Sequence, residues 1–174
     1  MKNYSRALEF LVERLDININ ILAYQMEINL DYLVKLFKRP TWQPRIDTIM
    51  KFSYYMGVNV IEFLVLSNPD FFPSSSRKIQ KLGEQSSLIL SLESWHIGKT
   101  LNYFRRVRNM TQADLSEITN FQISSISLRE SRRYDNKPTM KTLEIYCTAF
   151  NISLEVFVEK LLSFVSFDQN EKHA

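Results

Sequence analysis

The chain has 174 residues, enough for one medium domain or two small helical ones, and its net charge of +3 is only weak evidence for a polyanionic partner. Apolar residues make up 45%, which allows a packed core, but no apolar run approaches the ~18 residues of a membrane span. The single Cys147 excludes an intramolecular disulfide, and charged residues near the N-terminus interrupt any signal-peptide core. We therefore expect a cytoplasmic protein. Two scattered histidines and the lack of a Gly-rich phosphate loop predict no metal and no cofactor.

The chain contains an internal repeat. Residues 42–65 align with residues 136–159 without a gap when one segment is shifted by 94 positions, so that Pro44 meets Pro138. Each segment has the pattern of a helix introduced by the proline, a short turn and a second helix. Few glycines and prolines, together with long helical periodicities, favour an all-α fold of two tandem five-helix domains.

The first copy is expected to span residues 1–66. Leu8 and Leu11 mark its first helix, Asn18 caps the second and Asn29 opens the third. A helix introduced by the proline and a last helix complete the copy.

Residues 67–96 are expected to form a linker that is half loop and half helix. Asn68-Pro69 and Pro73-Ser74 are dipeptides typical of turns. The apolar residues that follow, such as Ile79, Leu82 and Leu92, recur at nearly helical spacing.

The second copy is expected to span residues 97–167. After a first amphipathic helix, Thr111 caps a short helix with Leu115 and Ile118 on its inner face. A turn around Asn120 leads to a third helix, which begins at about Gln122. The sequence therefore predicts two short helices joined by a tight turn.

The last helix carries an apolar stripe between residues 154 and 165 that is longer than a compact five-helix domain needs. The stripe either packs back on its own domain or forms a homodimer interface. The residues of this possible interface are Phe157, Leu161, Leu162 and Val165. Residues 168–174 are expected to be a disordered polar tail.

The second copy also carries a set of residues at characteristic spacings. They are Ile97-Gly98, Leu101, Phe104-Arg105, Met110-Thr111-Gln112-Ala113-Asp114-Leu115-Ser116, Ile126-Ser127 with Glu130, Pro138, Leu143 and Phe150-Asn151-Ile152-Ser153. Over about 65 residues the chain resembles the lambda-repressor-like helix-turn-helix regulators, also called the xenobiotic-response-element family. The resemblance implies a structural ion pair between Arg105 and Glu130. The chain departs from the family where Asn120 replaces the usual glycine and Arg129 replaces an apolar residue.

The resemblance also implies which residues contact double-stranded DNA. The second helix of such a motif crosses the phosphate backbone, and the third enters the major groove. A helix N-terminus such as that at Thr111 attracts a phosphate, and Ile123 and Leu128 are suited to thymine methyl groups. The predicted DNA-binding residues are Thr111, Gln112, Gln122, Ile123, Ser124, Ser125, Ser127, Leu128, Arg132, Arg133 and Lys137.

The first copy follows the same template with altered residues. Ile19 stands where the second copy has Gln112, and Val12 and Phe37 stand where it has the charged pair. Loss of both charges together is consistent with a buried pair, because removal of one alone strands the other. Asp31 near the start of the third helix would repel phosphates. Possible accessory DNA contacts remain at Lys35, Lys38 and Arg39.

These features predict a sequence-specific transcriptional regulator of the repressor type that acts as a homodimer, with a possible protein partner on the first domain. The alternative is a protein–protein interaction adaptor or an antitoxin-like partner whose DNA binding is weak or lost. We expect no enzymatic activity, since the residues suggest neither a nucleophile with its base nor a metal cluster.

Overall fold

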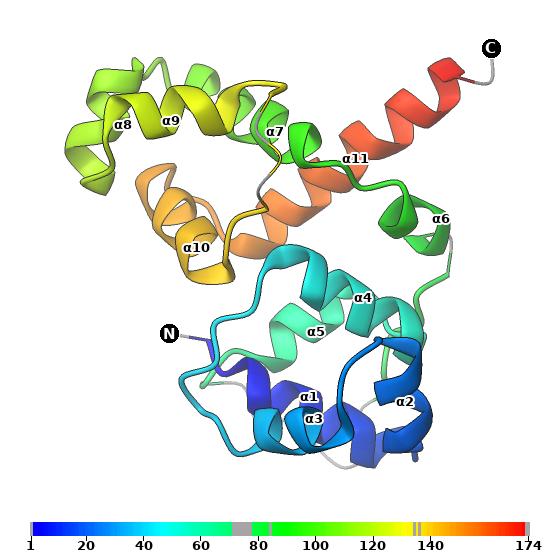
Figure 1. Ribbon diagram of the computed structural model, residues 1–174. Helices are drawn as coiled ribbons and strands as arrows, with labels where there is room; N and C mark the ends of the chain where they lie inside the picture. Colours follow the sequence, from blue (N-terminus) through cyan, green and yellow to red (C-terminus); the bar gives the residue numbers. More distant parts are fainter. Residues whose placement is uncertain (1, 71–77, 84, 134, 136, 173–174) are drawn as a thin grey trace. The chain divides into compact units, whose positions relative to one another are not determined.

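The computed structural model describes residues 2–70, 78–83, 85–133, 135 and 137–172 (Figure 1). This part of the chain contains eleven α-helices and no strand, which confirms the all-α prediction for the described residues. The chain divides into two compact units, Met1–Ile89 and Leu90–Ala174, which we call unit 1 and unit 2.

Most helices of unit 1 are preceded by an asparagine that caps their N-terminus. They are α1 (Tyr4–Arg14), α2 (Ile19–Gln25), α3 (Leu30–Phe37), α4 (Ile46–Met56), α5 (Val60–Leu66) and α6 (Gln85–Leu90), whose last residue already belongs to unit 2. The side chains of Asn3, Asn18, Asn29 and Asn59 accept backbone N–H groups that the first turn leaves free. Helix α1 packs on α3 and α5, and α4 packs on α2 and α5.

Part of the expected linker is built into unit 1. The backbone N–H of Asn59 donates to the carbonyl of Gln80 at 2.8 Å, and that of Leu82 donates to the carbonyl of Gly57 at 2.9 Å. Leu82 and Ile89 are buried. The expected linker, residues 67–96, is thus divided between the two units, whose boundary falls after Ile89.

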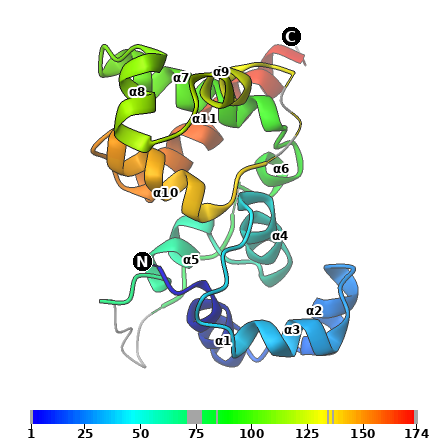
Figure 2. The ribbon, with the colours of Figure 1, turned by 60° about the vertical axis from the view of Figure 1, so that its left-hand side comes forward.

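Unit 2 contains the five remaining helices of the described chain. They are α7 (Ser94–Val107), α8 (Gln112–Thr119), α9 (Ile123–Glu130), α10 (Met140–Ala149) and α11 (Leu154–Lys172). Helix α7 packs on both α9 and α11, while α8 packs on α9 and α10 (Figure 2). Stacked rings of Phe104, Tyr146, Phe150 and Phe157 fill the core between these helices.

The apolar stripe of α11 lies inside the chain. Phe157, Leu161, Leu162 and Val165 are between 0% and 5% exposed, so the prediction that they form a dimer interface is wrong. The stripe is long because α11 packs against α7, which is itself longer than the first helix of unit 1. The buried stripe is therefore not accessible to a second copy of the chain.

The polar end of the chain is also ordered further than expected. The prediction of a disordered tail from residue 168 is wrong for residues 168–172, because α11 continues to Lys172. Asp168 lies 3.0 Å from Nε2 of the buried His96 and 3.3 Å from Nζ of Lys99. Burial lowers the pKa of His96, and the neighbouring Asp168 carboxylate opposes part of that effect. These contacts join the end of α11 to α7.

The two units place several backbone features 93 or 94 residues apart. Helices α3 and α9 begin at Leu30 and Ile123, which are 93 residues apart, and α5 and α11 begin 94 residues apart. Residues with left-handed backbone conformations follow the same spacing. The pairs are Asp16 with Asn109, Glu27 with Asn120, and Gly57 with Asn151. These helix starts and left-handed residues therefore recur at nearly the same spacing as the sequence repeat.

At Gly98, the backbone of α9 lies too close to α7 to leave room for a side chain. A Cβ atom at this position would lie 2.5 Å from the carbonyl oxygen of Arg129 and 3.3 Å from that of Glu130. Both neighbours are backbone atoms of α9, which cannot turn aside as a flexible side chain does. The absence of a side chain at Gly98 therefore permits the observed α7–α9 packing.

We predict that Gly98→Ala destabilises unit 2 by about 1–3 kcal/mol, because the added methyl group forces α9 away from α7. Chemical denaturation followed by circular dichroism measures the change. Arg106→Ala, at an exposed position on the same helix, is the control and should change stability by less than about 0.5 kcal/mol. Equal stability of Gly98→Ala and the wild type would show that the close approach has no structural importance.

Candidate functional site

Helices α8 and α9 are joined by a tight turn whose polar groups are bonded internally. Asn120 adopts a left-handed conformation with φ of 57°, which asparagine tolerates better than most residues. The Ser116 hydroxyl donates to the carbonyl of Phe121 at 2.6 Å, and the Thr119 hydroxyl accepts from the Phe121 N–H at 3.3 Å. The turn therefore holds the two helices at a defined angle.

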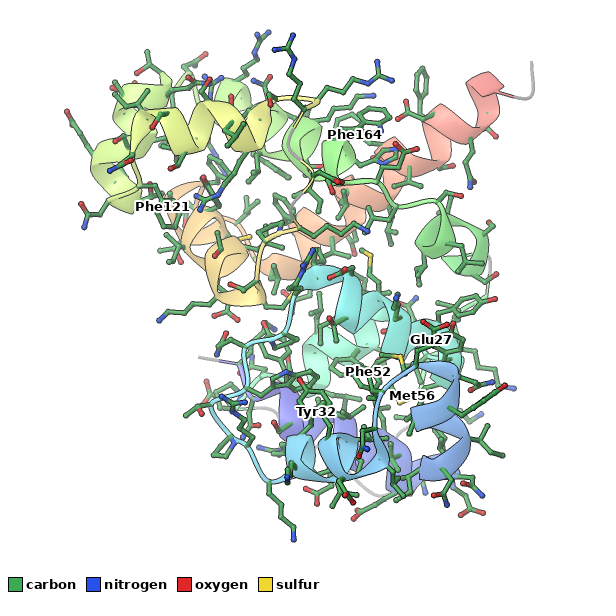
Figure 3. The ribbon with its side chains drawn as sticks, in the orientation of Figure 1. Glu27, Tyr32, Phe52, Met56, Phe121 and Phe164 are labelled. Carbon is green, nitrogen blue, oxygen red and sulfur yellow. The ribbon has the colours of Figure 1, made fainter. Side chains whose placement is uncertain are left out.

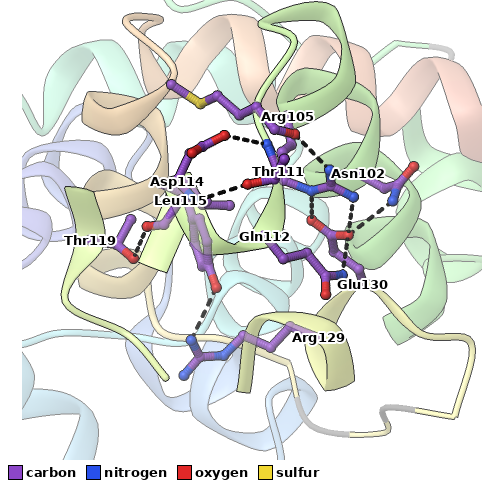
Figure 4. Close-up of polar contacts among 11 residues, drawn as sticks. Asn102, Arg105, Thr111, Gln112, Asp114, Leu115, Thr119, Arg129 and Glu130 are labelled. Atoms are coloured by element: carbon purple, nitrogen blue, oxygen red, sulfur yellow. Dashed lines mark hydrogen bonds and ion pairs between the residues drawn. The ribbon is translucent and has the colours of Figure 1, made fainter. Parts of the chain in front are cut away.

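A buried carboxylate connects three helices of unit 2. Glu130, at the end of α9, accepts hydrogen bonds from Nε of Arg105 at 2.7 Å and from Nη2 of Arg105 at 2.8 Å (Figure 4). Nε2 of Gln112 on α8 donates to it at 3.0 Å, and Nδ2 of Asn102 on α7 donates at 2.9 Å. The ion pair expected from the sequence is present, and two amides extend it.

Protonation of Glu130 is disfavoured in the folded chain. Burial alone would raise the pKa of this carboxyl, but the bonds from Arg105, Gln112 and Asn102 outweigh burial and lower the pKa from its usual 4.5. Nη1 of Arg105 also donates to the carbonyl of Met110 at 2.8 Å, in the connection between α7 and α8. One guanidinium thus bonds to the end of α9 and to the residue that precedes α8's cap.

The start of α8 is closed by a reciprocal cap. The Thr111 hydroxyl accepts the N–H of Asp114 at 3.1 Å, and the Asp114 carboxylate accepts the N–H of Thr111 at 2.7 Å. These bonds lower the pKa of Asp114. The side chains of Thr111 and Gln112, both predicted to bind DNA, therefore make hydrogen bonds to other residues of the chain. The Gln112 amide has two N–H donors, and Glu130 accepts one of them.

Helix α9 presents most of its predicted contact residues to solvent. Ile126 is fully buried and anchors the helix, whereas the large side chains of Ile123 and Leu128 are 49% and 51% exposed. The predicted polar residues on this helix and at its start are exposed at Gln122, Ser124 and Ser127, and half-buried at Ser125. The structure therefore brings these six residues to one short helix with its outer face open. By contrast, Ile118 on α8 is 56% exposed, so its expected place on the inner face is wrong.

The guanidinium of Arg129 covers two aromatic rings. Its guanidinium carbon lies 4.6 Å from the centre of the Phe121 ring and 5.9 Å from that of Tyr146. Nη1 of Arg129 also donates to the Tyr146 hydroxyl at 3.1 Å. The side chain thus connects the α8–α9 turn with α10, which explains how a charged residue is accommodated at this position.

The loop after α9 carries the predicted backbone contacts. Arg132 and Arg133 are exposed, and Lys137 is half-buried. Residues 134 and 136 of this loop lie outside the described residues. The guanidinium carbon of Arg132 lies 5.0 Å from the centre of the Trp95 ring at the start of α7. The indole N–H of Trp95 donates to Glu93 at 2.9 Å, and its ring stacks on His96, so that the surface under Arg132 is held in place.

Unit 1 has no counterpart to the charged network at its equivalent positions. Val12 is buried and Phe37 is half-buried. Ile19 begins α2 where Gln112 begins α8, and the exposed Asp31 lies in the first turn of α3. The possible accessory cations Lys35, Lys38 and Arg39 are all exposed. This part of unit 1 also exposes Ile21, Tyr24 and Tyr32, and Tyr24 has 85% of its surface free.

Several residues that position this site were missed by reasoning from the sequence. Asn102 and Trp95 belong to α7, and their partners Glu130 and Arg132 are more than 25 residues away. No local pattern marks such contacts. A clue existed only for Arg129, because the resemblance implies an apolar residue there, and a charged side chain in its place needs a specific partner.

Comparison with models of known protein families, with curated proteins and with solved structures finds no match to this chain.

We predict that Arg105→Val and Glu130→Phe each lower the stability of unit 2 by about 3–5 kcal/mol, because each leaves one buried charge unpaired. The double variant, which copies the apolar pair of unit 1, should lose much less than the sum of the two changes. Denaturant unfolding of all three variants measures the coupling.

The exposed pair Arg106→Ala and Glu117→Ala is the control, and its two effects should add. If the double variant lost as much stability as the sum of Arg105→Val and Glu130→Phe, the two side chains would not be energetically coupled.

Because the pKa of Glu130 is lowered in the folded chain, wild-type stability should fall as the pH drops below 4.5 and through the folded pKa. Variants that lack Glu130 should show a smaller loss.

Proposed function

We propose that the chain is a sequence-specific DNA-binding transcriptional regulator, of the repressor type, built from two tandem lambda-repressor-like helix-turn-helix domains. The observation that carries the proposal is the α8–turn–α9 arrangement, in which α9 is rigidly held from behind while its outer face is open. A recognition helix needs both properties, since base contacts depend on accurate placement and free access.

The composition of the open face supports duplex DNA as the partner. Small polar side chains at Ser124 and Ser127 allow close approach to base edges, and Ile123 and Leu128 are suited to thymine methyl groups. The exposed Arg132 and Arg133 follow in the next loop, where they can neutralise phosphates. Base contacts of the bidentate Arg–guanine kind are not expected from α9, so its preference is weighted toward A·T pairs.

The units divide their tasks in this proposal. The common spacing of helices and left-handed residues supports one fold for both units. Unit 2 reads DNA. Unit 1 carries Asp31 on its third helix and contributes at most accessory contacts to DNA.

A second candidate function, a protein–protein interaction module, is favoured by one observation in unit 1. The exposed side chains of Ile21, Tyr24 and Tyr32 lie on α2 and α3, the helices equivalent to α8 and α9. Exposed apolar and aromatic groups of this kind mark contact surfaces for other proteins. We propose that unit 1 binds a protein partner or a second copy of the chain there, since the stripe of α11 is buried.

No helix among the described residues combines the length and apolar character that crossing a membrane requires. The proposal of a regulator that acts on DNA in the cytoplasm requires no such helix. It also includes neither a cofactor nor an enzymatic step.

Selection of bound duplexes from a random library tests the proposed function directly. The wild-type chain should enrich a common motif. We predict that Gln122→Ala and Ser124→Ala each change the preference at one or two base positions by roughly 1–3 kcal/mol, with non-specific affinity nearly intact. Glu9→Ala, at an exposed position of α1 in unit 1, is the control and should leave the motif unchanged. Enrichment of no motif by the wild-type chain would refute the proposal.

Replacement of both Arg132 and Arg133 by alanine should weaken binding to all duplex sequences alike. The plot of log affinity against log salt should flatten by about one unit for each lost phosphate contact. Titrations at several salt concentrations measure the slope. An unchanged slope would place both side chains outside the interface.

A further inference from the structure

Cations and aromatic rings alternate along one surface of unit 2. Arg132 lies over Trp95, Lys99 lies between Trp95 and Phe164, and Lys160 lies between Phe164 and Tyr103. The distances from cation to ring centre are 5.0 Å for Arg132–Trp95, 5.4 Å for Lys99–Trp95, 4.7 Å for Lys99–Phe164, 4.6 Å for Lys160–Phe164 and 4.3 Å for Lys160–Tyr103. We call these six residues the cation–ring line.

The line begins at the end of the proposed DNA-reading helix and leads away from it. Arg132 follows α9 in the chain, Trp95, Lys99 and Tyr103 belong to α7, and Phe164 and Lys160 belong to α11. Figure 3 shows Phe164 on α11, at the place where this helix runs beside α7. The line is therefore continuous with the surface that carries Arg132 and extends it across two further helices.

The rings hold the cations without neutralising them. A cation over an aromatic face is attracted by the ring and keeps its full charge. A lysine that is already ordered loses less conformational entropy when it binds a phosphate than a free one does. Asp168 lies 3.3 Å from Nζ of Lys99 and offsets the charge of that residue, so that Lys160 is the stronger contributor beyond Arg132.

The geometry favours phosphates over stacked bases. Tyr103 and Phe164 contact one another edge to face, with ring centres 5.8 Å apart, and lysines lie near their centres. Trp95 is stacked on His96 and carries two cations. These ring faces are already used within the protein, whereas the cationic groups retain donors for an anionic partner. A single-stranded partner would need free ring faces on which to stack.

We propose that the cation–ring line binds the phosphate backbone of duplex DNA that flanks the site contacted by α9. This inference rests on the proposed function, since it extends the same interface. It assigns to α11 a role in DNA binding as well as in the core.

The test compares two duplexes that carry the selected site, one of minimal length and one with about ten further base pairs on each side, about one helical turn. Lys160→Gln in the full chain removes one charge from the line and keeps the aliphatic stem. We expect this variant to bind the long duplex about threefold to tenfold more weakly and to lower its salt slope by about one. Binding to the minimal duplex should not change.

Lys141→Gln, an exposed lysine on α10, is the matched control and should alter neither duplex. Lys160→Arg should retain the wild-type salt slope, and circular dichroism of each variant should retain the wild-type helicity. If Lys160→Gln proves unstable, Lys160→Met, which removes the same charge and keeps an apolar stem beside the rings, tests the same length-dependent loss. Equal effects of Lys160→Gln on both duplexes, or none on either, would overturn the cation–ring line while the proposed function stands. Failure of the wild-type chain to bind either duplex would overturn both.

Discussion

The buried carboxylate of Glu130 is the constraint on which the proposed interface depends. It lies at the end of α9 and is bonded by side chains of α7 and α8, so that one acceptor determines how three helices meet. Burial of a carboxylate is unfavourable unless its oxygens are fully bonded, and here four donated hydrogen bonds compensate for the lost water. Gly98 complements this arrangement, because the missing side chain lets the backbones of α7 and α9 approach. The outer face of α9 can then be open and still be rigid.

Unit 1 lacks this constraint and folds into helices without it. Its equivalent pair, Val12 and Phe37, is apolar, so packing takes the place of the bonded network. A helical scaffold at the same spacing persists without the charges, which shows that the network is not required for these helices to form. In our interpretation the network of unit 2 serves accurate placement of α9, and unit 1, which exposes Tyr24 and Tyr32, is free to use the equivalent helices for a different partner.

The features that the sequence predicted correctly depend on local patterns or on a paired substitution. Thr111 and Asp114 are three residues apart and form the cap that their spacing implies, and Asn120 takes the left-handed conformation typical of a turn. The pairing of Arg105 with Glu130 was predictable from the resemblance and from the joint loss of both charges in the first copy. The environment of α11 was not predictable, because an apolar stripe indicates that a face is buried and says nothing of what covers it. Likewise, the polar sequence around Asp168 is typical of a disordered tail. Its contacts with His96 and Lys99 of α7 depend on the tertiary structure and leave no local pattern in the sequence.

The most direct test of the proposed function is amide hydrogen exchange of the full chain, with and without the duplex enriched by selection. Exchange reports protection helix by helix, and the two units act as internal references for one another. A DNA-reading unit 2 predicts slower exchange at the start of α8, along α9 and in the loop that carries Arg132, with little change in α2 and α3. Protection concentrated in α2 and α3, or no protection in either unit, would contradict the assignment of DNA reading to α9.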